Sequence, residues 1–274
     1  MMNYFFEIFS YDFMLRALLV GTLVSLTASL LGVSLVLKRY SMIGDGLSHV
    51  GFGALSIALA LNLTPLYVSV PVCVIAAFFL LKLSENSKIK GDSAIALIAS
   101  SSLAFGVIAA SLSSGFSVDV YGYMFGSILA MQPSDVYVST TLCAVVLAVF
   151  ILCYHKIFAV TFDSDFAKAT GMKTNAYNML IALLTALTIV VGMRIMGTML
   201  ISSLIIFPAL TAMRVFKSFR SVIICAAFVS VICFFFGLVI SYIAAIPTGA
   251  SVVAVNLFVF LLFSAAGSLR RIAA

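Results

Sequence analysis

Charged side chains are scarce in this sequence. Only 9% of the 274 residues are Asp, Glu, Lys or Arg, whereas a soluble domain has about 25%. Hydrophobic residues make up 64%, and the mean hydropathy is +1.27. This composition excludes a soluble globule and predicts an all-α, polytopic integral membrane protein. The apolar runs are continuous rather than alternating, and the bilayer requires closed backbone hydrogen bonding, so the spans should be helices and not strands of a barrel.

The common catalytic motifs are also absent. There is no G-x-x-x-x-G-K-[ST] phosphate loop, so the chain should not bind and hydrolyse ATP by that route. There is no H-E-x-x-H and no G-x-S-x-G, which leaves no visible zinc-protease site or acyl-transfer nucleophile. No C-x-x-C occurs among the five cysteines. The basic residues stand singly or in small groups, so the net charge of +6 does not indicate nucleic acid. With these functions excluded, we expect a membrane protein of this composition to act in transport.

The apolar runs predict nine transmembrane helices, and a count of eight stays open. Each span needs about 20 mostly apolar residues. We expect one transmembrane domain over residues 1–274. The predicted spans are 13–37, 41–62, 66–83, 93–113, 135–154, 176–193, 196–215, 222–244 and 251–268.

The basic residues predict the orientation in a bacterial plasma membrane. With the N-terminus outside and the C-terminus in the cytoplasm, every Lys and Arg except Arg16 and Arg194 falls on the cytoplasmic side. The segment 114–133 is too polar for a span, and we expect a re-entrant or interfacial helix there, with Tyr121 and Tyr123 at headgroup level.

The segment G-D-G-L-S-H places Asp45 and His49 in an otherwise apolar run. On a helix these two residues lie on one face, one turn apart. An ionisable residue inside a membrane segment is costly and therefore suggests a functional site. A carboxylate and an imidazole suit Zn²⁺ or Mn²⁺, and no thiolate is present to favour Cu(I). The pair is predicted to be a metal site, and an Asp–His pair that holds two helices together is the open structural alternative.

Two ligands are too few for a stable transition-metal site. A homodimer with the pair near its two-fold axis would supply two carboxylates and two imidazoles. The residue count places the pair near the cytoplasmic end of the second span, whereas a transport site is expected near the midplane. Either the turn at 38–41 reaches into the membrane or the predicted boundary is wrong. Gly44 and Gly46 would permit a break or a close helix approach.

Two further segments carry predictions. In the polar loop 155–175, Asp163 should cap a short cytoplasmic helix whose first turn carries Asp165, and Gly171 should end it. An ordinary solvated loop is the alternative. In the seventh span, Pro208 should produce a kink. Gly197, Ser202 and Ser203 are small residues suited to helix packing, and a role in gating stays open.

Several segments together resemble the permeases of zinc/manganese-type ABC importers. The first is R-Y-S-M-I-G-D-G-L-S-H, residues 39–49, which is similar to that family's R-x-x-x-x-G-D-x-x-x-H segment. Residues 92–106, 121–129 and 197–212 resemble further motifs in the same order, and the similarity extends from about Arg16 to the C-terminus. D-F-A with Gly171, residues 165–171, resembles the E-A-A-x-x-x-G coupling loop, with Asp for Glu and Phe for Ala.

This resemblance implies a homodimeric membrane subunit without a permanently bound cofactor. A separate ATPase would bind the coupling loop through Asp163, Asp165, Phe166, Ala167 and Gly171. An extracytoplasmic binding protein would deliver the transported metal to Asp45 and His49. The stretches 185–188 and 197–212 look more like the zinc branch than the manganese branch. A permease for a metal chelate, such as an iron–siderophore or corrinoid, and a stand-alone secondary carrier are the alternatives.

Overall fold

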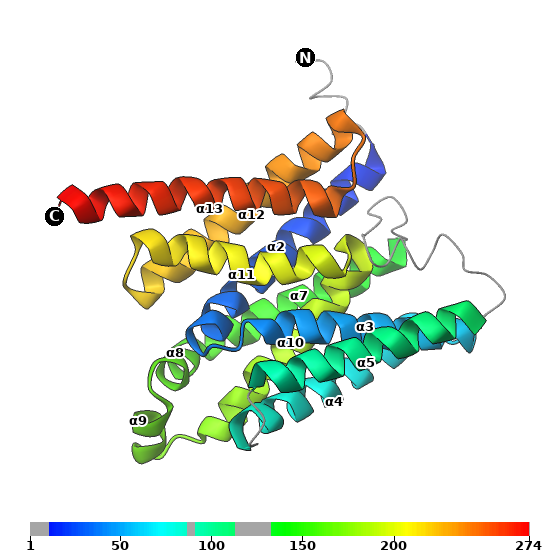
Figure 1. Cartoon of the computed structure of the whole chain (residues 1–274), viewed down its shortest axis with the longest axis horizontal. Coiled ribbons are helices and arrows are strands. Elements are labelled where there is room, and N and C mark those ends of the chain that lie inside the picture. Colours follow the sequence, from blue (N-terminus) through cyan, green and yellow to red (C-terminus); the bar gives the residue numbers. More distant parts are fainter. Residues whose placement is uncertain (1–10, 87–90, 113–132, 274) are drawn as a thin grey trace.

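The computed structural model describes residues 11–86, 91–112 and 133–273 (Figure 1). Over these residues the chain forms helices and no strand, which confirms the all-α prediction. The helices are α2 (Asp12–Leu37), α3 (Met42–Ala60), α4 (Pro65–Asn86), α5 (Gly91–Leu112), α7 (Pro133–Leu152), α8 (Tyr154–Phe162), α9 (Ser164–Ala169), α10 (Thr174–Met196), α11 (Thr198–Val215), α12 (Phe219–Ala244) and α13 (Thr248–Ala273).

Eight of these helices are long and apolar enough to cross a membrane. A ninth crossing is formed if α7 and α8, which are bent by 70° relative to each other, count as one span. The predicted count of eight or nine is therefore confirmed for the described residues. The predicted re-entrant helix at 114–133 lies outside the described residues, apart from Pro133, the first residue of α7.

The turns that carry basic residues gather toward one side of the bundle. In Figure 1 the α2–α3 turn, α8, α9, the α11–α12 turn and the C-terminus all lie toward the left. The α3–α4, α10–α11 and α12–α13 turns lie toward the right. This alternation fits the predicted topology, and which end faces the cytoplasm stays a prediction.

The bundle is built around α2 and α3. Helix α2 packs against α10, α11 and α12, and α3 packs against α4, α5 and α11, most extensively against α5. The α3–α5 contact depends on Gly53, because a Cβ there would lie 2.5 Å from the backbone oxygen of Ser102. Helix α12 is joined to α2 by a hydrogen bond from Ser230 Oγ to the Ser25 carbonyl, 2.8 Å long.

The turn between α2 and α3 is short and fully hydrogen-bonded. Arg39 has a φ of +61°, in the left-handed region. The Arg39 N–H donates to the Val36 carbonyl (3.0 Å) and the Tyr40 N–H donates to the Leu35 carbonyl (2.8 Å). This is the Schellman arrangement of a helix C-terminus, which satisfies carbonyls that the helix leaves free. The turn is therefore a defined structure and not a loose connection.

The structure differs from the predicted elements in two places. The polar loop 155–175 contains two helices, since α8 precedes the expected short helix α9. Gly197 was predicted inside the seventh span, but it is the single residue between α10 and α11, with φ +86° and ψ 163°. That backbone conformation is essentially restricted to glycine, so Gly197 permits the break between the two helices, and its role in packing or gating stays a prediction.

A substitution at Gly53 tests the close α3–α5 contact. Gly53→Ala should lower the free energy of unfolding by about 1–3 kcal/mol, because the added methyl forces α5 away from α3. Ala104→Ser, which adds one atom to an exposed position of α5, is the matched control and should have little effect. Thermal unfolding in detergent measures both, and equal melting temperatures for the two variants would contradict the contact.

Candidate metal-binding site

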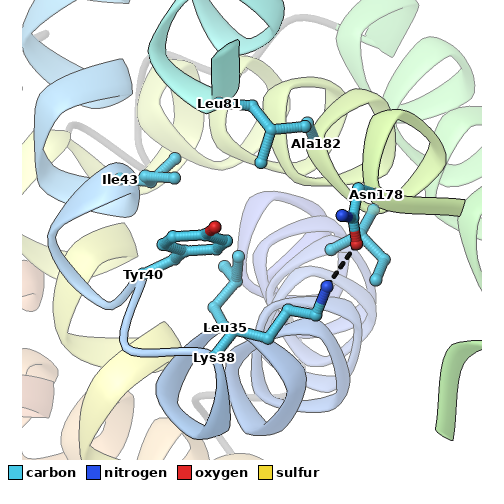
Figure 2. A pocket seen from close by; sticks show the side chains of 8 residues that line it. Leu35, Lys38, Tyr40, Ile43, Leu81, Asn178 and Ala182 are labelled. Carbon is cyan, nitrogen blue, oxygen red and sulfur yellow. Dashed lines mark hydrogen bonds between the residues drawn. The ribbon is translucent and has the colours of Figure 1, made fainter. Parts of the chain in front are cut away.

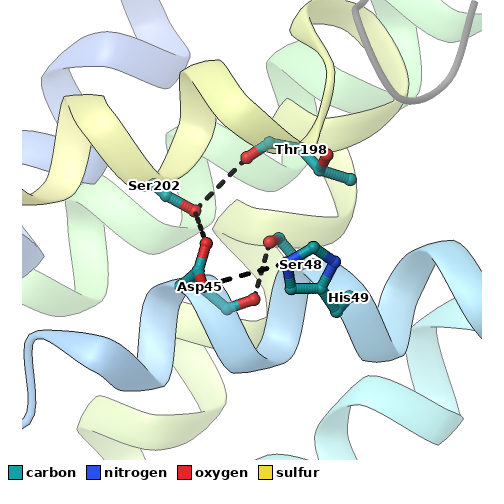
Figure 3. Close-up of polar contacts among 5 residues, drawn as sticks. All are labelled: Asp45, Ser48, His49, Thr198 and Ser202. Atoms are coloured by element: carbon teal, nitrogen blue, oxygen red, sulfur yellow. Dashed lines mark hydrogen bonds and ion pairs between the residues drawn. The ribbon is translucent and has the colours of Figure 1, made fainter. Parts of the chain in front are cut away.

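Asp45 and His49 lie one turn apart at the start of α3, as predicted (Figure 3). Asp45 Oδ2 and His49 Nε2 are 3.8 Å apart. This separation is longer than a hydrogen bond, for which about 2.7–3.2 Å is usual. Both residues belong to α3, and the structural alternative, a pair that holds two helices together, stays open.

Ser202 on α11 is the third side chain at this site. Its hydroxyl lies 3.3 Å from Asp45 Oδ1 and 3.2 Å from the Thr198 carbonyl, and it donates toward both acceptors (Figure 3). The hydroxyl of Ser48 donates to the Asp45 backbone carbonyl, 2.7 Å away. Ser202 thus ties α11 to the carboxylate. The sequence marked Ser202 only as a small polar residue in an apolar span, and nothing in it indicated this partner.

The two candidate ligands are accessible on one side. The Asp45 side chain is 42% exposed and the His49 side chain 26% exposed, whereas Ser202 is buried. His49 Nδ1 is buried, and among the described residues it has no hydrogen-bond partner. Within the described part of the chain no group of three or more His, Cys, Asp or Glu residues could hold a metal ion. One copy therefore offers one oxygen donor and one nitrogen donor.

Small residues bring two helices close to the pair. A Cβ at Gly44 would lie 3.0 Å from Ile205 Cδ1 of α11, and a Cβ at Gly46 would lie 2.6 Å from Ile95 Cγ2 of α5. The sequence prediction of a close helix approach around Asp45 is therefore confirmed. The pair is placed between α5 and α11, each of which touches α3 at a glycine next to Asp45.

The start of α3 is set back from the end of α11. Gly44 lies beside Ile205 and Asp45 beside Ser202. At about 1.5 Å rise per residue, these contacts are about 15–20 Å from the end of α11 at Val215. The predicted boundary of the second span was right within one residue, since α3 begins at Met42. The turn at 38–41 is closed by its Schellman hydrogen bonds, and its depth in the membrane stays a prediction.

The short helix predicted after Asp163 forms as α9. Asp163 is its N-cap and accepts hydrogen bonds from the backbone N–H groups of Asp165 (3.1 Å) and Phe166 (2.9 Å). Gly171 has a φ of +84° at the C-terminal end. Ala167 is buried, whereas the Phe166 side chain is 67% exposed. The segment is therefore a short helix rather than an irregular loop, and it exposes an aromatic residue.

The remaining residues singled out in the seventh span do not reach the pair. Ser203 is buried and donates to the Leu200 carbonyl of its own helix. Pro208 is buried within α11, which continues through it, and the predicted kink stays a prediction. Thr185 and Thr188 of α10 donate to carbonyls one turn earlier in the same helix. The two threonines thus give no contact that bears on the choice of metal.

The chain is similar to named metal transport proteins along nearly its whole length. It is 30% identical to the manganese import system permease protein ScaB of Streptococcus gordonii, covering 92% of this chain and 90% of that protein. It is 29% identical to the high-affinity zinc uptake system membrane protein ZnuB of Haemophilus influenzae, over 92% and 97%.

A solved structure and a family profile agree with these relatives. The structure of PsaBC from Streptococcus pneumoniae in complex with Fab matches with a TM-score of 0.86 and 29% identity, covering 96% of this chain and 95% of that one. Residues 10–267 match the family described as ABC 3 transport family. A match over this length shows that the protein is a multi-pass membrane protein that belongs to the ABC 3 transport family.

Proposed function

We propose that this chain is the membrane-spanning permease subunit of an ATP-driven importer for a divalent transition metal, zinc or manganese. The whole chain acts as one transmembrane domain in the bacterial plasma membrane, with its N-terminus outside and its C-terminus in the cytoplasm. ATP is hydrolysed by a separate subunit, and no cofactor is permanently bound.

The observation that carries this proposal is the Asp45–His49 pair. It is a carboxylate and an imidazole on one helix face, partly open and set back within the bundle. Ionisable side chains at such a place mark ion pathways. The 3.8 Å gap between Oδ2 and Nε2 leaves both atoms free to turn toward one cation, with ligand distances of about 2.0–2.2 Å for zinc. The names of the relatives, one for manganese and one for zinc, point to the same class of cargo.

The second pair of ligands comes from a second copy of the chain. One copy supplies two donors, and a transition metal takes four or more. The exposed sides of Asp45 and His49 are where another copy would bring its own pair. The resulting two oxygens and two nitrogens would hold the ion between the copies during its passage.

Zinc and manganese both fit this donor set. The preference for zinc expected from the sequence rests on resemblance alone, since the hydroxyls of Thr185 and Thr188 donate to carbonyls of their own helix. A measurement of which metal the intact transporter carries would decide between the two. The binding protein that delivers the ion is a second component that can set the metal selectivity.

The ATPase subunit binds α9. This helix is capped by Asp163, ended at Gly171 and exposes Phe166. The Phe166 ring is the apolar group that inserts into the ATPase surface, and the buried Ala167 holds α9 against the remainder of the permease. An extracytoplasmic binding protein delivers the ion on the opposite side.

Removing either ligand should abolish metal accumulation. We expect Asp45→Ala and His49→Ala each to reduce the zinc or manganese content of cells expressing the complete transporter to the level of cells without it. Mass spectrometry of whole-cell metal measures this, with immunoblotting of membranes to confirm that each variant is present. Asp12→Ala, at a carboxylate with an 87% exposed side chain, and His155→Ala, at an exposed imidazole on α8, are the controls and should retain uptake. Wild-type uptake by the Asp45 and His49 variants would refute the site.

The hydroxyl of Ser202 should matter only through Asp45. Ser202→Ala should raise the half-saturating metal concentration for uptake about tenfold, because the carboxylate loses the group that orients it. Ser203→Ala is the matched control, since that hydroxyl bonds only within α11. Uptake of radioactive ion by vesicles measures both variants, and equal effects would show that Ser202 is a packing residue.

The N-cap of α9 should be required for ATPase binding. Asp163→Ala removes the acceptor for two backbone N–H groups, which costs about 1 kcal/mol of helix stability and should weaken ATPase binding about fivefold. Asp163→Ser retains a capping oxygen and should bind normally. Copurification at graded ATPase concentrations measures the affinity, and unchanged binding by the alanine variant would contradict the role of α9.

A further inference from the structure

The first turn of α10 contacts two different elements of the bundle through neighbouring residues. Lys156 of α8 places its Nζ 5.5 Å from the centroid of the Tyr177 ring, within range of a cation–π contact. Lys38, at the end of α2, donates a hydrogen bond to Oδ1 of the adjacent Asn178 (Figure 2). One turn of α10 is therefore bound both to the arm that leads to α9 and to the turn that leads to α3.

On the α9 side the connection is short and closed by hydrogen bonds. The Gly171 N–H donates to the Lys168 carbonyl (3.1 Å) and the Met172 N–H donates to the Ala167 carbonyl (3.0 Å). This Schellman arrangement ends α9 only a few residues before α10 begins at Thr174. A displacement of α9 is accordingly transmitted to the start of α10 rather than absorbed by a loose loop.

The α3 side is equally short. Lys38 is the C-cap of α2, and the hydrogen-bonded turn at 38–41 leads directly to Met42, the first residue of α3. Asp45 is in the first turn of that helix. A shift of Lys38 relative to α10 therefore moves the carboxylate relative to α11, where Ser202 holds it.

A small pocket lies beside this hydrogen bond. Figure 2 shows the pocket between the end of α2, the start of α3, α4 and α10. The pocket holds no more than about one water molecule, so the turn and α10 are close-packed, and close-packed elements transmit strain with little compression. The lining residues are Leu35, Lys38, Tyr40, Ile43, Leu81, Asn178, Ile181 and Ala182.

We propose that the Lys38–Asn178 hydrogen bond is the link that couples movement of α9 to the Asp45–His49 pair. In this proposal Lys38 and Asn178 act as positioning residues, through the hydrogen bond that joins α2 to α10. This inference rests on the proposed function, because it assigns a route between the ATPase contact and the metal ligands. Without the link, ATP hydrolysis continues but the start of α3 no longer follows α10.

The test measures both reactions in one sample. The complete transporter, with its ATPase and binding protein, is reconstituted in liposomes, and uptake of radioactive zinc or manganese is measured together with release of phosphate. Lys38→Met and Asn178→Leu should each lower the metal moved per ATP hydrolysed at least about fivefold. Partial unfolding lowers both reactions together and leaves this ratio unchanged, so the ratio separates coupling from stability.

Three further variants make the test specific. Asn178→Asp keeps an acceptor for the ammonium group and should keep the wild-type ratio. Asn175→Leu changes an exposed residue in the same turn of α10 and should also keep it. In the double variant Lys38→Met with Asn178→Leu, the second change should have a smaller effect than it has alone, because the two residues share one hydrogen bond.

The outcomes distinguish the two proposals. If the wild-type transporter moves neither zinc nor manganese, the proposed function fails. If the wild type transports but Lys38→Met and Asn178→Leu retain its ratio, the coupling link is refuted while the function stands. Loss of coupling in Asn178→Asp, or multiplicative effects in the double variant, would also refute the link.

Discussion

The contact between Asp45 on α3 and Ser202 on α11 is the interaction on which the candidate site depends. A carboxylate inside an apolar bundle is costly unless polar groups compensate it. Here the neutral hydroxyl of Ser202 supplies one hydrogen bond, 3.3 Å long, and the remaining oxygen faces His49. The compensation is incomplete within one copy, and an arriving cation would complete it. A partly satisfied pair of this kind suits transient binding better than permanent storage.

The backbone conformation around the Asp45–His49 pair explains where the pair lies relative to α5 and α11. The turn before α3 is closed by left-handed backbone at Arg39. The glycines next to Asp45 allow α5 and α11 to pack closely against α3. Each feature on its own is a common packing device. Together they place the start of α3, with its acidic residue, beside the N-terminal half of α11, while the Asp45 side chain stays 42% exposed.

Periodic and local signals in the sequence were sufficient for much of this architecture. Continuous apolar runs predicted the long helices, because each helix satisfies its own backbone in a bilayer. The spacing of Asp45 and His49 predicted their shared face, and Asp163 with Gly171 predicted both ends of α9. Each of these features depends on residues that lie within one continuous segment of the chain.

Features that depend on distant residues were not predictable. Ser202 is 157 positions from Asp45, and Lys38 is 140 positions from Asn178. In both cases one partner is a small or amide side chain that is common in membrane helices and carries no sign of its contact. Helix α8 was missed because its sequence is too short and polar for a span, and Gly197 because a single-residue reversal leaves no polar segment.

The most direct test of the account is anomalous diffraction at the metal absorption edge, from crystals of the assembled transporter loaded with zinc or manganese. The account predicts one peak between two copies of the permease, within ligand distance of Asp45 and His49 from each. A metal peak elsewhere in a loaded transporter, with both side chains unliganded, would contradict it and assign the pair a structural role.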